Sequence, residues 1–156
     1  MKLQSAMEYL ITYGWAILIL GVTLVALYAL GVFNTNAFTP NICAFPASFG
    51  CLSSYLYANG VISINLQQST ASSINVTAIG CNTQGTLYGY NALTPNTIIP
   101  IGGNYTYQMS CYSSSNTVIF NGNIGAIYSG YVIVNYTDTQ TGFTHVVLGR
   151  LVQKVI

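Results

Sequence analysis

The pattern of hydrophobic and polar positions changes once along the chain, near residue 34. From Tyr9 to Phe33, 25 consecutive residues carry no charge, and about 20 apolar residues suffice for a helix to span a bilayer. From about residue 50 onward, apolar and polar residues alternate in short runs, which is typical of strands with one buried face. The pattern predicts an α+β protein in which a long hydrophobic N-terminal helix precedes an antiparallel β-sandwich.

Turn signals divide the second region into strands. Asn59-Gly60 separates the alternating runs Tyr55–Ala58 and Val61–Leu66, and an Asn-Gly pair favours a tight hairpin turn in which both central residues have positive φ. Residues 138–142 are expected to form the turn of the last hairpin. The other expected strands are 74–79, 86–90, 97–101, 105–111, 117–120, 130–137 and 143–155.

Charged residues make up only 3% of the chain, against roughly 25% in ordinary soluble domains. With 52% hydrophobic and 13% aromatic residues, the chain has ample material for a core, which excludes disorder. The cations are Lys2, Arg150 and Lys154. They make no basic patch, so nucleic-acid binding is not expected. The net charge of +1 also removes repulsion between copies and favours self-association.

One carboxylate stands at the start of the apolar segment. After Glu8 the next charged residue is Asp138, and a carboxylate taken out of water must be paired. Gly14 and Gly21 lie seven positions apart, roughly on one helix face, and each costs about 1 kcal/mol relative to Ala in a helix interior. Close helix packing or a need for bending would offset that cost. The alternative is a plain membrane anchor in which Glu8 faces water.

The segment Gln4–Leu18, QSAMEYLITYGWAIL, resembles the class III signal peptide of archaeal type IV pilin-like proteins, the archaeal pilin and archaellin superfamily. In that family a prepilin peptidase cuts on the cytoplasmic side just before the apolar segment, which is retained as the filament core. The resemblance implies a cut between Leu3 and Gln4. Glu8 then occupies mature position five, where pilins carry their characteristic Glu. One departure is that Leu3 replaces the Gly that is usual before the cut.

Such a cut would create an amino group on Gln4, one helical turn from Glu8. Within one chain the two groups would form a local ion pair. Between staggered chains, Glu8 would neutralise the Gln4 amine of a neighbour. An unpaired buried charge costs on the order of 3–5 kcal/mol, so this pair would penalise a wrong stagger more than it stabilises the right one.

The expected organisation has four parts: a cleaved leader over 1–3, the hydrophobic helix over 4–33, a connector over 34–47, and a β-sandwich head, Ig-like or pilin-type, over 48–156.

The resemblance implies a major pilin, the structural subunit of an archaeal type IV pilus-like extracellular filament used for adhesion or surface contact. Its partners would be other copies of itself in a helical homopolymer and, during assembly, a prepilin peptidase, a secretion ATPase and a membrane platform protein. The precursor would lie in the cytoplasmic membrane with its N-terminus inside, as Lys2 favours. The alternatives are a minor pilin or a membrane-anchored surface binding module.

The chain has four cysteines, and their spacings lack the close CxxC pairs of zinc sites. In an exported domain, disulfides are favoured over a metal site. Three pairings are possible. We favour Cys43 with Cys51, which closes a short loop, and Cys81 with Cys111; four free, buried cysteines are the alternative.

Three segments match the N-glycosylation sequon: Asn75-Val76-Thr77, Asn104-Tyr105-Thr106 and Asn135-Tyr136-Thr137. Glycans would give solubility to an exported protein with little charge, and we expect at least one sequon to be occupied. Asn135 alternates with Val134 and Tyr136, so it should lie on the opposite face of its strand.

Catalytic chemistry is not expected. The chain has one His and two acids, with no paired carboxylates, nucleophile elbow, glycine-rich phosphate loop or metal-ligand cluster in its sequence. His145 is expected to be an ordinary strand residue. We therefore expect neither an enzyme nor a cofactor.

Overall fold

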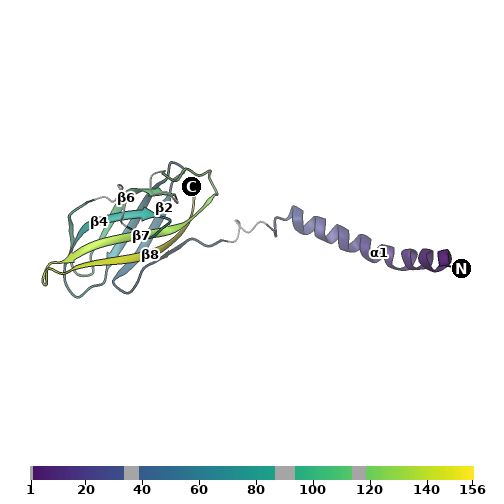
Figure 1. The fold of residues 1–156 in the computed structure, drawn as a ribbon, viewed down its shortest axis with the longest axis horizontal. Coiled ribbons are helices and arrows are strands. Elements are labelled where there is room, and N and C mark those ends of the chain that lie inside the picture. Colours follow the sequence, from purple (N-terminus) through teal and green to yellow (C-terminus); the bar gives the residue numbers. More distant parts are fainter. Residues whose placement is uncertain (1, 34–38, 87–93, 114–118) are drawn as a thin grey trace. The chain divides into compact units, whose positions relative to one another are not determined.

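The computed structural model describes residues 2–33, 39–86, 94–113 and 119–156. The chain divides into two compact units, Met1–Thr39 and Pro40–Ile156. The first contains a helix, and the second is built from β-strands (Figure 1). The predicted α+β class, with an apolar N-terminal helix followed by a sheet-rich domain, is therefore confirmed.

Helix α1 extends over Lys2–Ala29, a length of about 42 Å at about 1.5 Å per residue. Gly31 ends it with a φ of +70°, a left-handed conformation that glycine adopts readily. The Gly31 N–H donates to the Tyr28 carbonyl at 3.0 Å, and the Val32 N–H donates to the Leu27 carbonyl at 3.2 Å. These two bonds are those of a Schellman motif. This cap ends the helix before the apolar run itself ends.

The second unit contains eight strands in the part that the structure describes. Their order in the sheet is β1-β8-β7-β4-β6-β3-β2, and β5 pairs with β4. The pairing of β4 with β6 is parallel, and the other pairings of these strands are antiparallel. The strands are β1 (Ile42–Ala44), β2 (Phe49–Leu56), β3 (Val61–Gln68), β4 (Ile74–Asn82), β5 (Thr97–Ile99), β6 (Asn104–Tyr112), β7 (Ile127–Asp138) and β8 (Thr144–Lys154).

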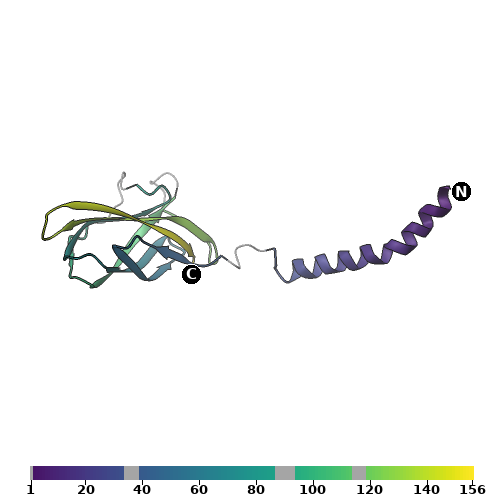
Figure 2. The same cartoon turned by 90° about the horizontal axis from the view of Figure 1, so that it is seen from below.

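The sheet curls around one core. Figure 2 shows β7 and β8, in yellow-green, on the opposite side of the domain from the blue strands β2 and β3. On one side, β4, which lies beside β7, meets β6, which lies beside β3. The contact between β4 and β6 is parallel and consists of two residue pairs. On the other side Leu56 of β2 forms a bridge with Val155, and the Ile156 N–H donates to the Leu56 carbonyl at 2.9 Å. The sheet is therefore continuous and roughly barrel-like.

The core follows the predicted alternation. In β3, Ile62, Ile64 and Leu66 are fully buried, and the intervening residues are only partly covered. Val132 and Val134 of β7 and several residues of β4 and β8 face the same core. Fully burying one such side chain contributes about 1.5–3 kcal/mol, so the domain has a hydrophobic core of its own.

The hairpin predicted at Asn59-Gly60 is confirmed, but the predicted turn type is wrong. Leu56 pairs with Ile62 across the hairpin, and the Gly60 N–H donates to the Tyr57 carbonyl at 2.9 Å. Gly60 has a φ of +80°, whereas Asn59 does not have a positive φ. The loop is one residue longer than expected, with a turn followed by a left-handed glycine. A Cβ at Gly60 would also lie only 2.0 Å from the Phe120 carbonyl oxygen.

Other strand predictions differ in extent. β1 lies inside the segment 34–47, which was expected to be a connector, and no strand was predicted there. β5 ends at Ile99, and the Gly103 N–H donates to the Pro100 carbonyl at 2.8 Å, which closes a turn before β6. Most of the predicted strand 86–90, and residues 117–118 of the predicted strand 117–120, lie outside the described residues.

Candidate functional site

The apolar surface of α1 is exposed on every side. Ile17, Leu18, Ile19 and Leu20 expose 67%, 66%, 51% and 62% of their surface. Four consecutive residues cover the whole circumference of a helix, because each is turned by about 100° from the last. By length and composition, Ile11–Ala29 is able to cross a membrane. An apolar surface of this extent needs lipid or protein around it.

Glu8 is exposed in the second turn of α1. Because the helix begins at Lys2, Gln4 and Glu8 lie one turn apart in the same helix. The side chains of Leu3 and Gln4 lie outside what the structure describes. The Thr12 hydroxyl donates to the Glu8 backbone carbonyl at 2.6 Å. This bond ties Thr12 to the backbone of Glu8 and does not involve the carboxylate.

No other described part of the chain packs against Gly14 or Gly21. Apart from its chain neighbours and the backbone of its own helix, a Cβ added at either position would meet no atom within 4 Å, and neither glycine has a left-handed φ. Nothing that surrounds them in the described chain therefore requires glycine. Their cost of about 1 kcal/mol each relative to Ala would be offset only by contacts with other molecules or by a need for the helix to bend.

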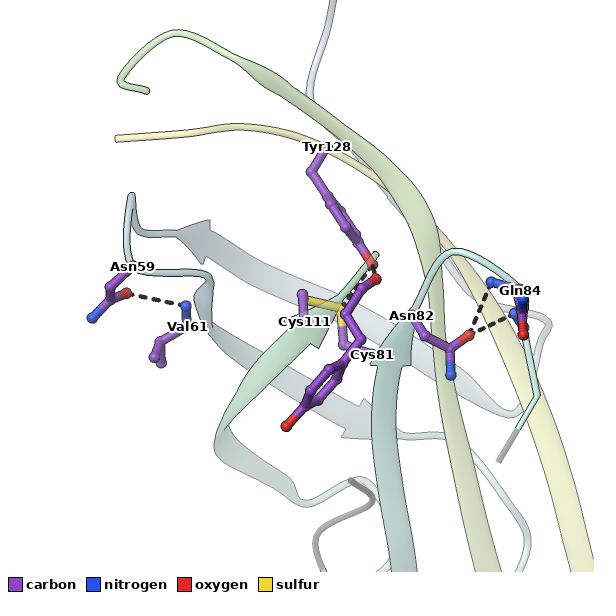
Figure 3. Close-up of a disulfide and its surroundings, with 9 residues drawn as sticks. Asn59, Val61, Cys81, Asn82, Gln84, Cys111 and Tyr128 are labelled. Atoms are coloured by element: carbon purple, nitrogen blue, oxygen red, sulfur yellow. Dashed lines mark hydrogen bonds between the residues drawn. A yellow bond between two sulfur atoms is a disulfide. The ribbon is translucent and has the colours of Figure 1, made fainter. Parts of the chain in front are cut away.

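Two disulfides cross the two junctions at which the sheet closes. Cys43–Cys51 joins β1 to β2, the first and last strands in the sheet order. Cys81–Cys111 joins β4 to β6 at their parallel contact of two residue pairs (Figure 3). These are the two pairings that the cysteine spacing favoured. Each disulfide thus reinforces the sheet where backbone hydrogen bonding is least extensive.

The Cys81–Cys111 disulfide is buried beneath Tyr128 of β7. Cys81 and Cys111 expose 1% and 0% of their surface. The Tyr128 hydroxyl lies 3.7 Å from the Cys81 Sγ and donates to the Tyr112 carbonyl at 3.0 Å (Figure 3). Burial raises the pKa of Tyr128 well above its ordinary value. Because both cysteines are buried, reductants have little access to this disulfide.

A buried polar network that the sequence analysis did not predict lies where β3 ends. Gln68 and Ser72 expose only 0% and 4% of their surface. The Gln68 Nε2 donates to the Pro100 carbonyl at 2.8 Å, and its Oε1 accepts from the Thr70 N–H at 2.7 Å. A signal was present in the sequence, because the inward positions 62, 64 and 66 continue to 68 in the same alternation.

Asp138 extends this network to the turn between β7 and β8. The Ser72 hydroxyl donates to one oxygen of its carboxylate. The backbone N–H groups of Gln140 and Thr141 donate to the other oxygen at 2.8 and 3.0 Å. These bonds, that from Ser72 first, hold the pKa of Asp138 below its usual value of 3.8. The carboxylate therefore links the turn to the loop before β4.

The three sequon asparagines lie on three different strands. Asn75 lies in β4, Asn135 in β7, and Asn104 is the first residue of β6. As predicted, Asn135 does not share the buried face of Val134 and Tyr136, which belong to the core. Asn104 is exposed, whereas the other two are partly covered.

The chain thus combines an uncovered apolar helix with a sheet domain whose core is closed by two disulfides, an architecture compatible with a pilin-like subunit. Comparisons with protein-family models and with curated proteins find no match.

Proposed function

We propose that the chain is a structural subunit, a major pilin, of an archaeal type IV pilus-like extracellular filament. Helix α1 would hold the precursor in the cytoplasmic membrane and then pack with other copies as the filament core. The sheet domain would form the outer shell as an Ig-like or pilin-type sandwich and would make surface contacts. The observation that carries the proposal is the helix that is apolar and exposed on all sides through Ile11–Ala29.

A plain membrane anchor accounts for the length and hydropathy of α1 but not for its details. An anchor needs no carboxylate at the start of its apolar segment and no glycines at positions 14 and 21. Helix packing between copies gives each of these residues a role, because glycine allows close approach and a carboxylate fixes register. Contacts of this kind join different surfaces of successive copies and do not close, which generates a helical filament.

Glu8 would act through its neighbour's N-terminus. If the leader is cut before Gln4, each copy carries one amine and one carboxylate near the start of its helix. Inside a packed core both groups are removed from water, and a carboxylate without its partner costs on the order of 3–5 kcal/mol. A copy that is staggered wrongly would pay this penalty, so the pair would select one register.

The test is substitution of Glu8 in the full chain in its own cells. Glu8→Ala and Glu8→Gln are expected to reach the membrane fraction at the wild-type level, while the filament yield falls at least tenfold because the neighbour's amine loses its partner. Thr12→Ala is the matched control. It lies one turn further on and alters a hydrogen bond to the Glu8 backbone without removing the carboxylate, so it should form filaments.

Electron microscopy of sheared surface material and immunoblots of membranes give the two readouts. Normal filaments from both Glu8 variants would overturn the register role. N-terminal sequencing of filament protein should begin at Gln4. A major subunit should be abundant in filaments of uniform width, whereas a minor pilin or a membrane-anchored binding module would be rare in them or absent.

A further inference from the structure

Two of the three sequons lie in strands that are held on both edges. Asn75 of β4 pairs with β5 on one side and β7 on the other. Asn135 of β7 pairs with β4 and β8. The side-chain Oδ1 atoms of both asparagines are buried and have no hydrogen-bond partner among the described residues. A glycosyl acceptor must enter the active site of a transferase together with its backbone, and strands paired on both sides do not allow this.

The hydroxyl groups of the same two sequons are also engaged in the sheet. The Thr77 Oγ1 donates to the Asn135 carbonyl at 3.2 Å. The Thr137 Oγ1 lies 3.3 Å from the Thr144 Oγ1 and shares a hydrogen bond with it. A sequon is read through its Ser or Thr hydroxyl as well as its Asn, so both sequons present an engaged hydroxyl in the folded domain.

Asn104 has a different position. It directly follows the turn at Pro100–Gly103, and its strand pairing is with Gln67 of β3. Asn104, Tyr105 and Thr106 are all exposed. A sequon at the end of a turn is the kind of surface position at which N-glycosylation is expected.

We infer that Asn104 is the N-glycosylated residue of this protein and that Asn75 and Asn135 remain unmodified. The inference rests on the proposed function in one respect, because the domain must be exported to meet the transferase. The ligand class is an N-linked oligosaccharide.

In the transfer step, the Asn104 Nδ2 forms a bond to the anomeric carbon of a lipid-phosphate-linked oligosaccharide supplied by the cell. The bond between that carbon and the phosphate oxygen breaks. The lipid phosphate departs with the bonding electrons, and the amide nitrogen loses one proton. Ile101 and Tyr105 beside Asn104 expose 62% and 45% of their surface, so a glycan here would also cover apolar surface.

The test is glycopeptide mass spectrometry of the full chain isolated from the surface of its own cells. Trypsin has sites only at Lys2, Arg150 and Lys154, so chymotrypsin is used to separate the three sequons. In the wild-type chain, the glycan mass is expected on the Asn104 peptide alone. Asn104→Gln and Thr106→Ala should reduce the intact mass to that of the bare polypeptide.

The matched controls are Thr106→Ser, which keeps the sequon, and Asn75→Gln and Asn135→Gln, which remove the other two. All three should retain the glycan. A glycan on Asn75 or Asn135, or a bare Asn104 on an exported chain, would overturn the inference. Filaments that carry a bare Asn104 would leave the proposed function standing, whereas an exported, glycosylated chain that never enters filaments would contradict only the function. A chain retained in the cytoplasm would overturn both.

Discussion

Leucine side chains are exposed along helix α1, whereas leucines in the core of the sheet domain are buried. Leu18 and Leu20 of α1 expose 66% and 62% of their surface, whereas Leu66 of β3 and Leu151 of β8 expose none. The sheet domain covers its apolar side chains with its own strands. The helix leaves its apolar side chains for lipid or other chains to cover. The domain is therefore stabilised by its own packing, whereas the stability of the helix depends on the lipid or protein that surrounds it.

The two regions also differ in how their ends are fixed. The junctions of the sheet are each crossed by a disulfide, which fixes the domain covalently. Helix α1 ends at a Schellman cap around Gly31, which closes the helix without attaching it to a partner. A subunit that moved from a membrane into a polymer, as proposed, would need this combination of a covalently fixed domain and a helix that changes its surroundings.

The largest expected contrast comes from one substitution made in each region. Leu66→Ala should lower the free energy of unfolding of the sheet domain by about 2–5 kcal/mol, because it leaves a cavity at a fully buried site. Leu20→Ala, the matched control in α1, should leave that free energy unchanged. Urea unfolding of the full chain in detergent, monitored by hydrogen exchange of the β3 and β6 amides, measures the free energy of unfolding of both variants. Equal effects of the two substitutions would contradict the independence of the regions.

The disulfides give a smaller contrast within the sheet domain. The Cys81–Cys111 bond spans 30 residues and the Cys43–Cys51 bond spans 8. A longer closed loop restricts the unfolded chain more. The free energy of unfolding should therefore fall by roughly 3–4 kcal/mol in Cys81→Ala/Cys111→Ala and by roughly 2–3 kcal/mol in Cys43→Ala/Cys51→Ala. Urea unfolding of the two double variants measures the difference.

Accessibility gives a second readout for the same pair of bonds. Cys43 and Cys51 are only partly covered, whereas Cys81 and Cys111 are buried. Under native conditions a thiol reductant should therefore open Cys43–Cys51 first, as measured by alkylation and mass spectrometry. Reduction in the opposite order would show that Tyr128 and its surroundings do not shield the inner disulfide.

Much of the fold could be predicted because its signals are local. The uncharged run after Glu8 specifies α1, period-two alternation specifies β3, and Asn59-Gly60 marks a hairpin. β1 was missed because three residues are too few to show alternation, and its register partners, such as Leu151 for Cys43, are far away in the sequence. The parallel contact between β4 and β6 depends on long-range pairing in the same way.

The candidate site likewise has features with local sequence signals and features that depend on long-range contacts. The spacing of Gln4 and Glu8 and the three sequons are visible in the sequence. The difference between Asn104 and the other two sequon asparagines depends on which strands lie beside each of them. Asp138 could be recognised as a turn residue. Its bond to Ser72 could not, because the two residues are 66 positions apart.

The smallest expected effect concerns acid and tests whether the sheet domain depends on its single side-chain carboxylate. Of the two acids in the chain, Glu8 belongs to the helix, and Asp138 is the one in the sheet domain. The hydrogen bond from Ser72, followed by the backbone bonds from Thr141 and Gln140, lowers the pKa of Asp138 below 3.8 in the folded state. The stabilisation is therefore complete above the unfolded-state pKa and is lost as the pH falls through the folded-state pKa.

Between about pH 5 and pH 2, the sheet domain of the wild-type chain should lose stability more steeply than that of Asp138→Asn, which keeps an acceptor for the turn but does not titrate. Ser72→Ala should lie between them, because it removes the largest cause of the pKa shift and leaves the backbone bonds. The C-terminal carboxylate titrates in all three chains, so it cancels in the comparison. Urea unfolding at each pH gives the slopes. Equal slopes for the wild-type chain and Asp138→Asn would mean that the hydrogen bonds to this carboxylate do not favour its charged form in the folded domain, and would contradict the prediction.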